Sequence, residues 1–219
     1  MIELDIFSDV ICPWCLIGKR RLERALVQHP EVKARITWRA FQLNPDMPRD
    51  GMSRQLYVET KFGGTDRAKA VYDNIRAQGG SEDLDFAFEK IQRTPNTVDA
   101  HRLIRRATEL EKADPLVEAL FAAYFFEGRD IGDHEELAKI GAEAGLDHDE
   151  IMTFLASDDG EAEVQAETQF AFQNGITGVP CFIINRRYAV SGAQPPEAFT
   201  PLFDLALQEA AETELTPAK

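Results

Sequence analysis

The chain has 219 residues, 44% of them hydrophobic, with a formal net charge of -14 and a sequence pI near 4.7. This length suits one large domain, or one domain that carries an insertion. The acidic charge argues against a nucleic-acid partner, because a phosphate-binding groove needs clustered lysines and arginines. The sequence has no run of about 18 apolar residues, so we expect no transmembrane helix and no membrane partner.

The N-terminal segment predicts a βαβ unit. Residues 2–7 alternate weakly between apolar and polar side chains, as a strand does, and a helix follows over residues 13–28. The His-Pro dipeptide at residues 29–30 ends this helix, because proline removes a backbone donor and restricts the residue before it. Residues 32–41 alternate again and predict a second strand.

The middle of the chain, residues 44–157, predicts helix after helix and no strand. One helix starts with Pro115 at its first position and stops at Gly128. Another starts at Asp147, which has capping-box spacing to Glu150.

The sequence predicts two further strands near the C-terminus. A helix that starts at Asp158 leads into a strand at residues 181–184, a turn, and a second strand at residues 188–191, which together predict a hairpin. A last helix opens at Pro195-Pro196, and the polar residues after 211 are expected to fray.

This order of elements indicates an α/β fold of the form βαβ…αββα, interrupted by a large all-helical insertion. The predicted α/β domain comprises residues 1–43 and 158–212. The predicted insertion comprises residues 44–157, and residues 213–219 form a polar tail.

Two of the three cysteines lie where the first strand meets the first helix, in the motif Cys12-Pro13-Trp14-Cys15. Cys15 falls on the apolar face of the predicted helix and is expected to point inward. Cys12 precedes the first full turn, where unpaired N–H groups and the positive end of the helix dipole stabilise a thiolate. The pKa of a thiol in this position can fall to about 3.5 to 7.5 from about 8.5, although Asp9 nearby opposes the shift.

This asymmetry suits thiol–disulfide exchange, in which an exposed Cys12 attacks a substrate disulfide and a shielded Cys15 then releases the reduced substrate. Two other interpretations stay open. A zinc site would need two further ligands, and the candidates, Cys181 and the four histidines, show no paired spacing. The cysteines could also be inert, although three are too few for a disulfide scaffold and a reducing compartment disfavours a structural bridge.

Further motifs accompany the cysteine pair in order along the chain. They are Ser8-Asp-Val-Ile-Cys-Pro-Trp-Cys15, Phe41-Gln-Leu-Asn-Pro45, Asn96-Thr-Val-Asp-Ala-His101-Arg-Leu, and Gly175-Ile-Thr-Gly-Val-Pro180 followed by Ser191-Gly-Ala-Gln194. Over nearly its whole length the chain resembles the DsbA-type branch of the thioredoxin superfamily, in which a helical domain is inserted into the thioredoxin fold. Within this branch it is similar to the FrnE-like subgroup, which adjoins the 2-hydroxychromene-2-carboxylate isomerases and the kappa-class glutathione transferases.

The resemblance implies roles for four residues outside the cysteine motif. It implies that the Val179–Pro180 bond is cis, that Pro180 faces the redox cysteines, and that the backbone of Val179 pairs with a substrate chain. It also implies that Asn96 and His101 lie over the active site, where they could contact substrate or tune Cys12. From the residues alone, Pro180 also fits a strand edge, and His101 fits a plain core or surface histidine.

Cys181 departs from the family pattern, because an apolar residue or threonine is common directly after this proline. One interpretation is a small buried hydrophobe on a core strand. The other is a third thiol that lines the site, reaches Cys12 and forms an alternative disulfide.

We therefore predict a thiol–disulfide oxidoreductase with Cys12 as nucleophile, Cys15 as resolving thiol, and Pro13 and Trp14 lining the site. It needs no bound organic cofactor or metal, and it acts on protein or small-molecule disulfides. Glutathione or a thioredoxin-type system would be its electron partner. A cytoplasmic location is expected, because the first residues lack the basic and apolar regions of a signal peptide.

Two alternative functions belong to other classes. The first is a glutathione-dependent isomerase or transferase for a small aromatic substrate, whose relatives typically have serine where Cys12 stands. The second is a non-catalytic module that binds a peptide or small molecule. Among redox functions, oxidase, reductase and isomerase differ in reduction potential and all stay open.

Overall fold

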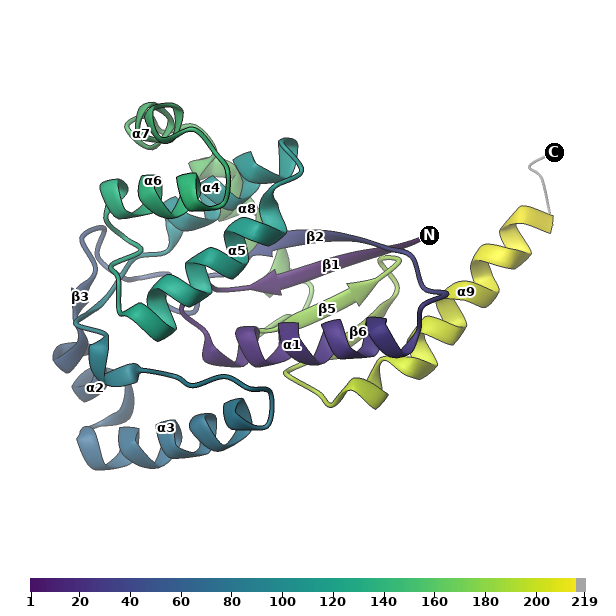
Figure 1. The fold of residues 1–219 in the computed structure, drawn as a ribbon, viewed down its shortest axis with the longest axis horizontal. Helices are drawn as coiled ribbons and strands as arrows, with labels where there is room; N and C mark the ends of the chain where they lie inside the picture. The colour runs from purple at the N-terminus through teal and green to yellow at the C-terminus, as the bar shows by residue number, and fades with distance from the viewer. Residues whose placement is uncertain (216–219) are drawn as a thin grey trace.

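A four-stranded mixed sheet forms the centre of the molecule (Figure 1). The computed structural model describes the backbone of residues 1–215 and the side chains of residues 1–209. The strand order is β2-β1-β5-β6, with β1 parallel to β2 and antiparallel to β5. The strands are β1 (Ile2–Ser8), β2 (Ala34–Ala40), β5 (Cys181–Ile184) and β6 (Tyr188–Ser191).

Helices cover both faces of this sheet (Figure 1). The Phe182 ring of β5 lies 5.1 Å from Phe199, which precedes α9 (Thr200–Leu215), so Phe182 points to the face that α1 (Pro13–Gln28) and α9 cover. On the opposite face, Phe7 of β1 stacks at 6.3 Å on Phe170 of α8 (Glu161–Gln173). The sheet is therefore sandwiched between helices, as in other α/β domains.

The predicted βαβ unit is confirmed. Helix α1 begins at Pro13, where a missing N–H costs no hydrogen bond, and ends before His29, whose N–H donates to Ala25 and Leu26. The hairpin of β5 and β6 and the start of the last segment at Pro196 also match the prediction. The α/β fold class expected from the sequence is thus the fold observed.

The chain over residues 54–155, called the helical block below, is mainly helical. In Figure 1 its helices over residues 98–155 lie beyond the β2 side of the sheet, whereas its helices over residues 54–80 lie at the lower left, toward α1. The remaining helices are α2 (Arg54–Phe62), α3 (Thr65–Gly80), α4 (Val98–Glu109), α5 (Ala113–Ala122), α6 (His134–Glu143) and α7 (His148–Leu155), with short turns η1 (Phe88–Lys90), η2 (Ala123–Glu127, π-helical) and η3 (Pro196–Ala198).

The prediction of an all-helical insertion over residues 44–157 is wrong in one respect. Two strands, β3 (Met52–Ser53) and β4 (Arg93–Thr94), pair antiparallel within it. Each strand has two residues, which is too short to show alternation in the sequence. The proposed domain limits themselves stay a prediction.

Several predicted helix ends differ from those observed. Asp147 caps α7 as expected, accepting a hydrogen bond from the Glu150 N–H. In contrast, α8 starts after Gly160 rather than at Asp158. The expected polar tail, residues 213–219, is helical through Leu215, so fraying directly after residue 211 is wrong, and residues 216–219 lie outside the described part of the chain. No helix in the described part is long and apolar enough to cross a bilayer.

A fully buried arginine, Arg102 of α4, holds the end of α7 and the connection into α8. The Arg102 guanidinium of α4 donates to the carbonyl groups of Phe154 (3.1 Å), Ser157 (2.6 Å) and Asp159 (2.7 Å). It also donates to the carboxylate of Asp99 at 2.5 Å. Arg102 thus fixes the end of α7 and the connection into α8 to α4.

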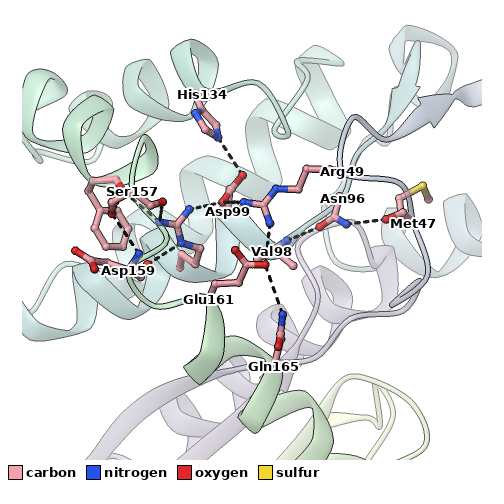
Figure 2. Close-up of polar contacts among 12 residues, drawn as sticks. Met47, Arg49, Asn96, Val98, Asp99, His134, Ser157, Asp159, Glu161 and Gln165 are labelled. Carbon is pink, nitrogen blue, oxygen red and sulfur yellow. Dashed lines mark hydrogen bonds and ion pairs between the residues drawn. The ribbon is translucent and has the colours of Figure 1, made fainter.

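Asp99 extends this arginine-centred network (Figure 2). Its carboxylate also accepts hydrogen bonds from Arg49 at 3.1 Å and from His134 of α6 at 3.0 Å. Burial raises the pKa of Asp99, but the hydrogen bonds from His134 and Arg102 and the charge of Arg49 outweigh burial and lower it. The carboxylate is therefore held ionised beside Arg49 and Arg102.

We predict that Arg102→Met costs about 3–5 kcal/mol in the free energy of unfolding, because it removes the guanidinium from the carbonyl groups of Ser157 and Asp159 and takes a charged partner from the buried carboxylate of Asp99. The matched control is Arg106→Met on the same helix, which removes an exposed arginine paired with Glu109. That change should cost no more than about 1 kcal/mol. Denaturant unfolding of both variants checks this, and equal losses would contradict the structural role of Arg102.

Gly18 of α1 supplies a second packing constraint. A Cβ atom at this position would lie 2.7 Å from Cγ of Pro180 and 3.1 Å from Phe182. The absence of a side chain therefore lets α1 approach the start of β5.

Gly18→Ala is expected to lower the free energy of unfolding by about 1–3 kcal/mol through overpacking. The control Gly80→Ala, at the end of α3, meets no atom within 4 Å. It should raise stability by up to about 1 kcal/mol, as alanine does in helices. Unfolding midpoints of the two variants measure the difference, and stabilisation of both would show that Gly18 is not a contact point.

Candidate active site

The cysteine motif starts α1 where the sequence predicts. Cys12 is the residue directly before the helix, and Pro13 is its first helical residue. The Cys12 N–H donates to the Asp9 carbonyl at 2.9 Å, and the Cys15 N–H donates to the Cys12 carbonyl at 3.0 Å. These bonds form a tight turn that places the Cys12 sulfur at the positive end of α1.

The loop before β5 lies directly against this turn. The Cys12 thiol donates to the Val179 carbonyl at 3.6 Å, although the two residues are 167 positions apart. The Val179–Pro180 peptide bond is cis. Gly18 leaves room for Pro180 against α1, so Cys12, Val179 and Pro180 form one surface.

Cys12 is less exposed than the sequence suggested. Its exposed fraction is 4%, against 2% for Cys15, and both are free thiols. Cys12 is covered because its thiol turns inward onto the Val179 carbonyl. Pro13 and Trp14 are half-buried and form the outer part of the motif.

The two thiols differ in their electrostatic surroundings. Burial, and then the hydrogen bond and charge of neighbouring Cys12, raise the pKa of Cys15 well above its usual value. The Ser8 hydroxyl and the Asp9 backbone act against this shift. Reduced Cys15 therefore holds its proton at neutral pH and must lose it before it can act as a nucleophile.

His101 of α4 reaches the turn that carries the cysteines. Its Nε2 atom lies 3.6 Å from Oδ1 of Asp9, and the exposed fractions of the two residues are 3% and 0%. Asp9 in turn accepts hydrogen bonds from the Leu43 N–H at 2.8 Å and the Ile11 N–H at 3.4 Å. The sequence indicated that Asp9 is a neighbour of Cys12, but it did not predict the pairing of Asp9 with His101. Asp9 and His101 belong to two of the motifs that carry the family resemblance, and this was the one sequence feature that could have suggested the pairing.

Asn96 forms hydrogen bonds at the start of α4 (Figure 2). Its side-chain carbonyl accepts from the Val98 N–H at 3.0 Å, and its amide donates to the Met47 carbonyl at 2.8 Å. These bonds give Asn96 a positioning role in the loop before the helix. None of them is made to the cysteine motif.

Cys181 lies on the other face of the sheet from α1. It pairs with Phe7 across β1 and β5, and both pack in an apolar cluster with Phe41, Ala171 and Ile176 beneath α8. Its neighbour Phe182 points to α1, as alternation along a strand requires. The expectation that Cys181 lines the site beside Cys12 is therefore wrong, and burial raises the pKa of its thiol.

The metal interpretation finds no support in the geometry. Among the residues described, no group of three or more histidine, cysteine, aspartate and glutamate side chains could hold a metal ion. The Cys12 thiol is engaged with a backbone carbonyl instead.

Comparison with solved structures shows where this fold recurs. A probable DsbA oxidoreductase from Streptomyces coelicolor is 34% identical, with a TM-score of 0.86 over 100% of this chain and 93% of that one. The cytosolic disulfide reductase DsbM from Pseudomonas aeruginosa, in its structure with GSH, is 18% identical with a TM-score of 0.63, over 94% and 99% of the two chains. A 2-hydroxychromene-2-carboxylate isomerase is 14% identical with a TM-score of 0.66, over 98% and 100%.

The DsbM and isomerase structures are similar to this chain in fold, and the Streptomyces coelicolor protein is similar in both fold and sequence. Residues 3–203 match the model of the DSBA-like thioredoxin domain. This match spans the sheet, the cysteine motif, the helical block and the loop at Pro180. The chain therefore belongs to the DSBA-like thioredoxin family.

Proposed function

We propose that the protein is a thiol–disulfide oxidoreductase that acts through Cys12 and Cys15. The observation that carries this proposal is the position of Cys12 at the N-terminus of α1, against the carbonyl of Val179. Membership of the DSBA-like family supports the reaction class.

The reaction proceeds in two exchanges. The Cys12 thiolate attacks one sulfur of a substrate disulfide, and the other substrate sulfur leaves as a thiolate. Cys15, having lost its proton, then attacks the Cys12 sulfur of the mixed disulfide. The first substrate sulfur leaves, so the substrate gains two electrons and the cysteine pair becomes a disulfide.

The loop at Val179 and Pro180 supplies the platform for substrate. When the Cys12 sulfur is in a mixed disulfide it no longer donates a hydrogen bond, so the Val179 carbonyl is free to accept one from a substrate backbone. Pro13 and Trp14 flank the same surface and contact the substrate from the helix side. His101 and Asp9 lie behind the motif and position it from within.

Glutathione is the electron donor that we propose for the reduction of the oxidised pair. The structure of DsbM with GSH, which shares this fold, supports the choice. DsbM is described as cytosolic, which agrees with the cytoplasmic setting expected from the sequence. A thioredoxin-type system is the alternative donor.

We predict that equilibration across a glutathione redox series converts Cys12 and Cys15 together, in one two-electron transition. The measurement is alkylation of free thiols followed by mass mapping of the modified cysteines. The control Cys181→Ala should leave the midpoint unchanged, because Cys181 lies on the opposite face of the sheet. If Cys12 becomes glutathionylated and never pairs with Cys15, the glutathione-dependent isomerase or transferase takes the place of this proposal.

Cys15→Ser should trap the mixed disulfide, because the serine hydroxyl cannot resolve it. Incubation with a disulfide peptide is expected to give a stable covalent adduct at Cys12, seen as a mass increase that a thiol reductant removes. Cys12→Ser should give no adduct. Peptide binding of equal strength after loss of both thiols, without adducts in the wild type, would instead favour a binding module.

A further inference from the structure

An open groove of about 1020 Å³ lies between α4 and α7 of the helical block and reaches the start of α8. In Figure 1, α7 lies at the top of the molecule, above α4, α6 and α8. Helix α7 packs on α6 through Ile151, which lies against Gly141, and its C-terminal end is bonded to Arg102 of α4. The groove follows the remaining space between α4 and α7, and no residue of the cysteine motif lines it.

Apolar side chains form part of the lining of this groove. Leu103 and Ile151 are buried there, and Leu146 and Phe154 are half-buried. Leu110, at the end of α4, is 46% exposed and lines the same space. Exposed apolar side chains that are rimmed by charged ones mark interaction sites.

The charged side chains of the lining leave uncompensated negative charge. The cations are already engaged within the chain: Arg102 with Asp99, Arg105 with Glu167, Arg106 with Glu109, and Lys112 with the Gly145 carbonyl. In contrast, three carboxylates of the lining have no cationic partner among the side chains that the structure describes, namely Glu150 of α7, Asp159, and Glu163 of α8. An occupant of the groove therefore meets free carboxylates beside apolar side chains.

The backbone beside the groove favours a helical occupant over an extended one. The carbonyl groups of Phe154 and Ser157 accept from Arg102, and that of Gly145 accepts from Lys112. An extended peptide binds by pairing its backbone with a free sheet edge, which the two helices do not offer. An α-helix satisfies its own backbone and needs only side-chain contacts.

The length of the groove also suits a helix. Along α4 the lining runs from Leu103 to Leu110, which is roughly 10 Å at a rise of 1.5 Å per residue, or about two helical turns. An amphipathic helix presents apolar side chains at i, i+3 or i+4, and i+7 over this distance.

We propose that the groove between α4 and α7 docks a basic, amphipathic α-helix of a partner protein. The apolar face of that helix lies on the apolar lining. Lysine or arginine side chains on its flanks meet Glu150 on the α7 wall and Asp159 and Glu163 at the start of α8. This docking site is separate from the cysteine motif and does not depend on the function proposed above.

The test uses a synthetic, fluorescein-labelled peptide of about 14 residues, close to the shortest length that forms a helix in water. It carries leucines at i, i+3 and i+7 and lysines on both flanks. A charge-reversed version has glutamate for each lysine, and a scrambled version has the same composition without an apolar face. Fluorescence anisotropy should show saturable binding of the first peptide to the wild-type protein. Both other peptides should bind at least about tenfold more weakly, because one is repelled and the other cannot cover the apolar lining.

Two groove variants locate the binding. Glu150→Gln combined with Glu163→Gln should weaken binding of the basic peptide about fivefold, through the loss of two exposed ion pairs. Leu110→Ser should weaken it about fivefold, through the loss of apolar contact. The matched control is Glu197→Gln combined with Asp204→Asn, which removes two exposed carboxylates near the start of α9. It should change the affinity by less than about twofold, which separates docking from the general attraction of a basic peptide to an acidic protein.

Three results would overturn this inference: no saturable binding of the basic peptide, equal affinity for the scrambled peptide, or unchanged affinity in both groove variants. Sedimentation tests the other occupant. A wild type that self-associates, and that Leu110→Ser returns to a monomer, would assign the groove to a second copy of the chain instead. Cys12→Ser combined with Cys15→Ser should leave peptide binding unchanged, so failure of the redox function and failure of the docking site are distinguishable.

Discussion

The contact between the start of α1 and the Val179–Pro180 loop is the constraint on which the rest of the site depends. Pairing of β1 with β5 brings the two segments to the same end of the sheet, with Phe7 opposite Cys181. Gly18 then lets α1 lie directly on Pro180. The Cys12 sulfur therefore meets a backbone carbonyl at 3.6 Å, and the motif and the loop form the single surface on which we propose that substrate binds.

The same packing imposes a chemical requirement on Cys15. A thiol buried beneath α1 is shielded from solvent and keeps its proton, because the low-dielectric interior disfavours the thiolate. Resolution of a mixed disulfide needs that thiolate. Behind the motif, the buried side chains of Asp9 and His101 lie 3.6 Å apart. The turn that carries the cysteines is therefore backed by polar groups.

Local sequence signals were sufficient at two helix starts that depend on local chemistry. Pro13 at the start of α1 and Asp147 at the start of α7 act through their own backbone or side chain, so their spacing alone predicted the helix starts. The position of Cys181 depends instead on the register between β1 and β5, which no local pattern reveals. The burial of Cys12 likewise depends on a carbonyl 167 residues away. Strands β3 and β4 are distant in sequence and have two residues each, so the sequence shows no alternation of apolar and polar residues at either strand.

Helix α4 connects the helical block to the turn that carries the cysteines through two neighbouring side chains. Arg102 points toward the end of α7 and the connection into α8, where three hydrogen bonds hold it, and a fourth joins it to Asp99 of α4 itself. His101, one residue earlier, points toward Asp9 behind the cysteines. Because the buried arginine fixes the rotation and height of α4, it also fixes where the imidazole lies relative to the motif. The helical block therefore helps to shape the site that we propose, since α4 packs His101 against the turn that carries the cysteines.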